Sequence, residues 1–104
     1  MKLTTKKEVA LKSGKVIAEG SEFEATFNRE NPSSCLVKFE GLDAFNTTSE
    51  RVAKLANEMQ LIDFCDLEEV AMDSICPSLL GYDVEPDGWD EEGSPSWLLA
   101  LGLI

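Results

Sequence analysis

The sequence has 104 residues, of which 43% are hydrophobic and 28% charged, and these proportions are ordinary for one globular domain. Its charge is unusual, because 9 lysines and arginines stand against 20 aspartates and glutamates, so the net charge is −11. The chain contains no histidine, which removes the commonest general base near neutral pH and the commonest metal ligand. Wholesale disorder and direct binding of nucleic acid or of anionic membrane are therefore disfavoured.

The first 48 residues predict a small antiparallel sheet. Residues 8–17 form two apolar segments around a serine-glycine turn, a pattern typical of a hairpin. Apolar and polar residues alternate with a period of two over residues 22–27 and 35–40, so each of these strands is expected to bury one face. With a last short strand predicted over residues 45–48, these elements indicate a small curled sheet or barrel.

Short helices are predicted in the rest of the chain. Apolar residues in the range 52–59 recur at helical spacing, and Thr47 with Glu50 has the pattern of a capping box. A second amphipathic helix is predicted over residues 67–75. It is expected to end there, because Pro77 disfavours helical backbone in the residue before it. An irregular turn and a short edge strand are expected over residues 78–84.

The run V-x-L-K-S-G-K-V-I-x-E-G-x-x-F-E-A-T-F, residues 9–27, resembles the opening hairpins of SH3-like barrels. The resemblance is one of pattern, and it implies an SH3-like antiparallel sheet or barrel at the N-terminal end. Together with the predicted helices, it leads us to expect a single α+β domain over residues 1–104. Its β-rich part would span residues 1–48, and its helical, acidic part, with two or three short helices, residues 49–104.

An acidic turn and an apolar tail end the sequence. Residues 85–88, E-P-D-G, place proline and glycine where a β-turn favours them, with the glycine expected at positive φ. Ser94 and the proline after it have the pattern of an N-cap and a first helical position, so a helix is predicted over residues 95–101, closing on Gly102. The tail, residues 97–104, either docks into the core or forms an exposed patch for a partner or self-association.

Three cysteines, Cys35, Cys65 and Cys76, form no C-x-x-C pair, and the N-terminus lacks the apolar run of a signal peptide. The sequence therefore predicts a cytosolic protein. Cys35 lies in an apolar strand pattern and Cys76 at a predicted helix end, so inert buried thiols are expected. No base that would activate a cysteine nucleophile is evident.

Charge is distributed unevenly along the chain. Residues 1–40 carry a net charge of +1 and residues 41–104 carry −12, with no lysine or arginine after Lys54. Such a field attracts cationic protein surfaces, above all those that bind nucleic acid, although acidic surfaces also serve solubility alone. We expect an acidic interaction surface with aromatic anchors, and the rival hypothesis is that both tryptophans close over the sheet. The residues predicted to bind a basic protein partner are Tyr82, Asp83, Glu85, Asp87, Trp89, Asp90, Glu91, Glu92 and Trp97.

Two other hypotheses for the acidic residues fit less well. Asp83, Glu85 and Asp87 fall at positions 1, 3 and 5 of a calcium loop, but Ser94 occupies position 12, where a bidentate glutamate closes such sites. Paired carboxylates also serve glycosidases, but a chain of 104 residues with clustered acids has little room for a sugar cleft. We therefore predict no catalytic residue, no metal site and no cofactor.

The C-terminal stretch resembles a signature of small uncharacterised proteins encoded by phages and related mobile elements. It has the form V-E-P-D-G-x-D-x-x-G-x-P-S-W-L-L-x-L-G-L-I and covers residues 84–104. The resemblance implies phage origin, action in the host cytoplasm and binding of a host factor, for example inhibition of a nucleic-acid-handling protein by charge mimicry. The alternative is a structural or assembly component that self-associates through residues Trp97 to Ile104.

Overall fold

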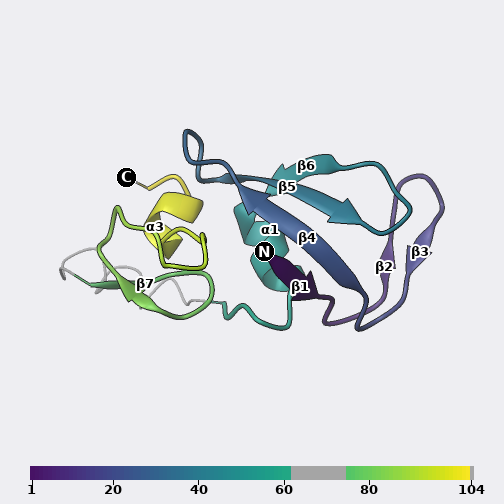
Figure 1. The fold of residues 1–104 in the computed structure, drawn as a ribbon, viewed down its shortest axis with the longest axis horizontal. Coiled ribbons are helices and arrows are strands. Elements are labelled where there is room, and N and C mark those ends of the chain that lie inside the picture. The colour runs from purple at the N-terminus through teal and green to yellow at the C-terminus, as the bar shows by residue number, and fades with distance from the viewer. Residues whose placement is uncertain (62–74, 104) are drawn as a thin grey trace.

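The chain folds into an antiparallel sheet packed on one helix, followed by a lobe of turns and short strands (Figure 1). The computed structural model describes residues 1–61 and 75–103. A four-stranded sheet of order β1-β4-β5-β6 forms the body, while β2 with β3 and β7 with β8 form separate two-stranded sheets. The elements are β1 Lys2–Thr4, β2 Val9–Ala10, β3 Val16–Ile17, β4 Glu22–Phe27, β5 Ser34–Phe39, β6 Phe45–Thr48, α1 Ser49–Leu55, β7 Cys76–Pro77, β8 Asp83–Val84 and α3 Trp97–Ala100.

The predicted α+β class is confirmed, but the SH3-like barrel is not closed. The predicted hairpin forms, with Val9 opposite Ile17, and the Leu11 N–H donates to the Lys15 carbonyl at 2.8 Å. No described strand links this hairpin to the four-stranded sheet. Because a barrel needs continuous pairing around its wall, the hairpin is instead an arm beside β5 and β6 (Figure 1).

The predicted alternation is confirmed in β4 and β5, where every second side chain from Phe23 to Phe27 and from Cys35 to Phe39 is buried. Phe23 lies opposite Phe39, and the two rings are 5.2 Å apart between centroids. The residues of α1 that complete this side of the core are Val52 and Ala53. The core therefore sits between one face of the sheet and the helix.

The predicted capping box of α1 is wrong, because Thr48 rather than Thr47 is the N-cap. The Thr48 hydroxyl accepts the Arg51 N–H at 3.2 Å, so arginine occupies the position where a capping box needs glutamate or glutamine. The helix also ends earlier than predicted, since Ala56 is extended and forms a bridge with Thr5. The helix therefore ends where Ala56 pairs with Thr5, although the apolar pattern of the sequence continues beyond that point.

The lobe, residues 75–103, is built from turns. The predicted turn over residues 85–88 is confirmed, and the Gly88 N–H donates to the Glu85 carbonyl at 2.8 Å. Gly88 is not at positive φ as predicted. Glycine is favoured there by space, since a Cβ would lie 3.0 Å from the Glu85 oxygen. The Gly81 backbone, at φ 93°, turns the chain between β7 and β8, where the predicted edge strand forms.

The terminal helix α3 begins later than predicted, because Ser96 is its N-cap and accepts the Leu99 N–H at 3.2 Å. Pro95 lies outside the helix and forms a bridge with Trp89. The predicted closure on Gly102 is confirmed by its φ of 72°. Trp97 and Leu98 are each only 3% exposed, so α3 docks into the core and joins the lobe to the body.

The molecule is elongated, with principal extents of 43 × 25 × 22 Å. The lobe lies at one end of the long axis and the β2–β3 arm at the other (Figure 1). The helix predicted over residues 67–75 falls on residues outside the described ranges, apart from its last position. In the described residues, no helix has the length and apolar character needed to cross a membrane.

Candidate functional site

An acidic hollow of about 370 Å³ lies on the lobe. It brings together six of the nine residues predicted to bind a basic partner, with Val84 as the further lining residue. Of the other three, Glu85 and Asp87 lie exposed on the adjoining turn, and Trp97 is buried in the core. The lining residues, called the acidic hollow from here on, are Tyr82, Asp83, Val84, Trp89, Asp90, Glu91 and Glu92.

Two backbone elements build the walls of the hollow. The β7–β8 hairpin carries Tyr82 and Asp83, and the Ser78 N–H donates to the Tyr82 carbonyl at 2.7 Å. The second wall is the segment 89–95, held by the bridge of Trp89 with Pro95 and by the Asp90 N–H, which donates to the Ser94 carbonyl at 2.9 Å. Local hydrogen bonds hold both walls. Turns therefore bring together residues that helix or strand periodicity would not place on one face.

Asp90 supports the hollow from inside. It is 7% exposed, and its carboxylate accepts hydrogen bonds from the Ser78 hydroxyl at 2.6 Å, the Ser94 N–H at 3.0 Å and the Ser94 hydroxyl. Burial alone would raise the pKa of Asp90, but these bonds and one from the Glu92 N–H outweigh it, so the pKa lies below its usual value. Asp90 is thus an ionised structural anchor, with its oxygens already engaged.

Trp89 carries the clearest chemical signal in the hollow. The guanidinium carbon of Arg29, which comes from the loop between β4 and β5, lies 4.2 Å from the centroid of the Trp89 ring system. A cation at this distance over an indole is attracted by the negative face of the ring. Trp89 is half-buried, and its ring already accommodates a planar cation.

The remaining hollow residues are available to a partner. Tyr82 is 54% exposed, and the carboxylates of Asp83, Glu91 and Glu92 also face solvent. Exposed carboxylates beside aromatic rings form an arrangement that recognises cationic side chains. The hollow therefore offers one aromatic wall, one phenol and a rim of acids.

Two of the three cysteines lie in the described residues, and both are free. Cys35 and Cys76 are both buried, as predicted, and burial raises the pKa of the Cys35 thiol to about 11, which keeps it protonated. The placement of Cys76 at a helix end was wrong, since it lies in β7. Within residues 1–61 and 75–103, no three histidine, cysteine or acidic side chains converge into a possible metal site.

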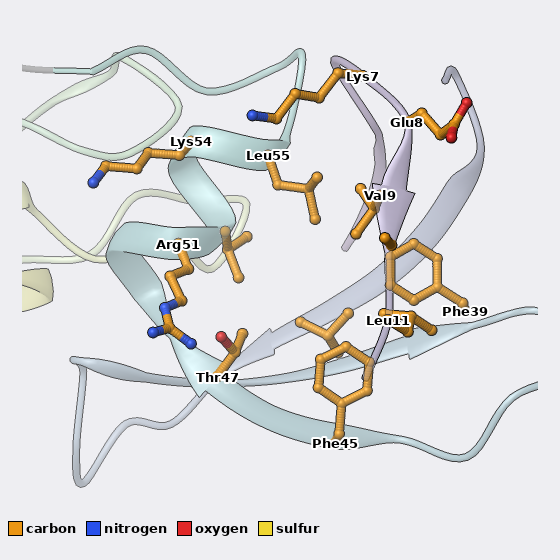
Figure 2. A pocket seen from close by; sticks show the side chains of 13 residues that line it. Lys7, Glu8, Val9, Leu11, Phe39, Phe45, Thr47, Arg51, Lys54 and Leu55 are labelled. Carbon is orange, nitrogen blue, oxygen red and sulfur yellow. The ribbon is translucent and has the colours of Figure 1, made fainter. Parts of the chain in front are cut away.

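A second surface, which the sequence analysis missed, lies at the opposite end of the molecule. Two adjoining cavities of about 450 and 680 Å³ run between the β2–β3 arm, β6 and α1, and they share lining residues such as Leu11, Phe45 and Arg51. Figure 2 shows the first of them. We call them the cationic groove. Five of the nine lysines and arginines of the chain line it: Lys7, Lys12, Lys15, Arg51 and Lys54.

The sequence contained a partial signal for this groove. Lys12 and Lys15 flank the predicted hairpin turn, and Arg51 and Lys54 lie one helical turn apart, so each pair was visible as a local cluster. What the sequence did not show was that the open barrel places both clusters around one apolar hollow. The two clusters lie around one hollow because the β2–β3 arm does not pair with the four-stranded sheet.

Comparison of the chain with protein-family models, with curated proteins and with solved structures gives no match. The phage-like signature of the C-terminal stretch therefore stays a prediction.

Proposed function

We propose that the protein is a non-enzymatic binding module that uses the acidic hollow to take cationic side chains of a basic protein partner. The observation that supports this most directly is the meeting of six of the nine predicted residues around one cavity of about 370 Å³. A solvated acidic surface has no need of such a hollow. Aromatic rings and exposed carboxylates combined in one concave site favour recognition over solubility alone.

The chemistry of the hollow suggests how a basic partner would be held. Exposed Asp83, Glu91 and Glu92 would steer a cationic surface and pair with its lysines or arginines. Trp89 would add a cation–π contact of the kind it already makes with Arg29. Because exposed ion pairs are screened by salt, binding of this kind weakens as ionic strength rises.

Charge also suggests the class of partner. Residues 41–104 carry a net charge of −12, and cationic surfaces of such strength are typical of proteins that handle nucleic acid. In this proposal the lobe occupies the surface that such a protein offers to a phosphate backbone. Inhibition of a host factor by charge mimicry, and phage origin, are the forms of the proposal that the C-terminal signature favours.

The test uses a defined probe, a short peptide of alternating arginine and glycine, titrated into the protein while tryptophan fluorescence is followed. Trp89 lines the hollow and Trp97 is buried, so the binding signal comes from Trp89 and is lost in Trp89→Phe. We expect Glu91→Gln with Glu92→Gln to weaken binding about fivefold, since each exposed pair contributes up to about 1 kcal/mol.

The matched control is Glu19→Gln with Glu22→Gln, which removes the same charge from exposed positions outside the lobe. It should leave the affinity nearly unchanged. Equal weakening by both double variants would mean that net charge alone attracts the peptide. A peptide in which citrulline replaces arginine should not bind; if it bound as well, cation recognition would be excluded.

The alternative proposal is an assembly component that self-associates through residues 97–104. Its support in the structure is Leu103, which is 58% exposed, whereas Trp97 and Leu98 are committed to the core. Light scattering over a wide concentration range tests it with Leu103→Glu. A molecular mass that rises with concentration in the parent protein and stays monomeric in the variant would favour this alternative.

A further inference from the structure

We propose that the cationic groove binds an extended acidic segment of a partner protein, which pairs with the edge of β6 that no described strand occupies. This site is separate from the acidic hollow, opposite to it in charge, and does not depend on the proposed function. The argument rests on an open sheet edge, an apolar floor along that edge, and a concentration of cations around it.

The two edges of the four-stranded sheet differ. At β1 the edge is closed, because the Thr4 N–H donates to the Glu58 carboxylate at 2.6 Å and the Thr4 carbonyl accepts the Asn57 N–H at 2.9 Å. At β6 no described segment pairs with the outer edge, and the sheet order ends there. An unpaired strand edge presents a row of backbone donors and acceptors, which is the template for adding a strand from another chain.

The groove follows this edge. Phe45 and Thr47 line both cavities and share the face of β6 that is turned to the core, since Phe45 lies opposite buried Val37. Asn46, which alternates to the other face, lines the second cavity as well. The groove therefore borders three consecutive residues of β6, along the strand to which a segment would be added.

The floor of the groove is apolar. Val9 of the arm faces Leu55 of α1 across it, and Leu11 and Phe45 also line it (Figure 2). Phe45 is 38% exposed, a large apolar side chain left open at the end of the sheet. An extended segment has alternate side chains on opposite faces, so every second residue would enter this floor.

Cations surround the floor. In the described part of the chain, Lys54 forms an ion pair with Glu50 at 3.4 Å. The other cations of the groove form no ion pair there, namely Lys7, Lys12, Lys15 and Arg51. The acids that line the groove are Glu8 and Asp43. Carboxylates flanking the apolar positions of an incoming segment would meet this excess of positive charge.

The net charge of the chain favours a short protein segment over a large polyanion as the ligand of the groove. The whole chain carries −11, so a long polyanion such as nucleic acid is repelled at distances where the groove is not yet felt. A short acidic segment must gain affinity from contacts that act only at close range. Backbone pairing with β6 and burial of apolar side chains are such contacts, and both belong to strand addition.

The probe is a short, blocked, fluorescently labelled peptide of alternating glutamate and valine, titrated into the full-length protein and followed by anisotropy. Two further peptides carry N-methyl groups on the backbone nitrogens of either the odd or the even residues. In strand pairing, only alternate N–H groups face the neighbouring strand. We expect one methylated peptide to lose binding by roughly tenfold or more, since several hydrogen bonds are removed, and the other to bind like the parent.

The matched pair of protein variants is Arg51→Glu and Lys2→Glu, which change the net charge equally. Arg51→Glu creates the capping box with Thr48, so the variant helix is not weakened. We expect it to lower affinity roughly fivefold, and Lys2→Glu, outside the groove, to have little effect. Equal binding of both methylated peptides, or equal loss in both variants, would overturn the proposal. So would dimerisation abolished by Arg51→Glu, which would make a second copy the occupant.

Discussion

The body of the molecule and its lobe are held together by different interactions. In the body, large apolar side chains on β1, β4, β5 and α1 pack into one core. In the lobe, turns converge on buried polar groups. Of the six buried polar residues in the described ranges, four lie there, namely Ser78, Asp90, Ser94 and Ser96.

This difference has a consequence for how each region responds to change. Hydrophobic packing scales with buried area, whereas a buried polar network fails when one partner is lost. Every buried side-chain nitrogen or oxygen in the described residues has a hydrogen-bond partner, so the lobe network is complete. We expect the body to set the overall stability and the lobe to be the more sensitive to single polar changes.

The two regions also present opposite charges to solvent. The lobe carries the acidic hollow, and the arm with α1 carries the cationic groove, at the far end of a molecule 43 Å long. Separation along the long axis keeps each local field from cancelling the other, because it exceeds the screening length of about 8 Å at physiological salt. Under the two binding proposals, the acidic hollow and the cationic groove would therefore act independently.

The largest expected effect comes from Phe39→Ala in the body. Phe39 is 2% exposed and packs on Phe23 and Phe45, with ring centroids 5.2 and 6.2 Å away. Loss of the ring should lower the free energy of unfolding by about 4 kcal/mol, measured by urea denaturation. The control, Leu36→Ala, truncates an exposed residue on the outer face of β5 and should cost about 0.5 kcal/mol. Similar losses in both variants would contradict the placement of the core.

The second-largest expected effect is a loss of stability in the lobe that leaves the body folded. Asp90→Ala leaves three hydrogen-bond donors from Ser78 and Ser94 without their acceptor and should cost about 3 kcal/mol. Hydrogen exchange should show the loss mainly in amides of residues 76–96, with β4 and β5 still protected. Exposed Asp87→Ala is the control and should change neither. Uniform loss of protection would mean that lobe and body unfold as one unit.

Acidification tests the same anchor without changing the chain. Because the folded pKa of Asp90 lies below its unfolded value of about 3.9, the stability it contributes is complete above that value. It is lost as the pH falls through the lower folded pKa. Thermal unfolding between pH 6 and pH 2 should therefore show less acid destabilisation in Asp90→Asn than in the parent protein. Parallel curves would show that Asp90 is not the acid-sensitive anchor.

The sequence was sufficient where order arises from periodicity. The alternation in residues 22–27 and 35–40 identified both central strands and their buried faces, because a strand covered on one face requires that pattern. It was insufficient at the ends of helices. Thr47 and Ser94 were plausible caps by type. The residue after each is paired outside the helix, Thr48 with Ser34 and Pro95 with Trp89, so the caps fall at Thr48 and Ser96.

The site was predicted in part for a similar reason. Six of the nine residues predicted to bind a partner line the acidic hollow, but residue type alone did not separate buried Asp90 from exposed Glu91 and Glu92. Nor did it show that Trp97 lies in the core while Trp89 lines the hollow. Burial of a polar side chain depends on partners from other turns, here Ser78, and a local pattern does not contain them.

The smallest expected effect lies at the contact between body and lobe. Arg29, in the loop after β4, stacks on Trp89, and exposed cation–π contacts of this kind contribute about 0.5 to 1 kcal/mol. A double-mutant cycle of Arg29→Ala and Trp89→Phe, followed by urea denaturation, should give a small coupling energy, and Arg29→Lys should retain part of it.

The Arg29→Ala variant also tests the binding proposal, because Arg29 occupies a ring that a basic partner would use. If Arg29 competes with the partner, Arg29→Ala weakens the fold slightly but tightens binding of the arginine peptide. Weaker binding in that variant would instead mean that Arg29 holds Trp89 in the orientation that the hollow requires.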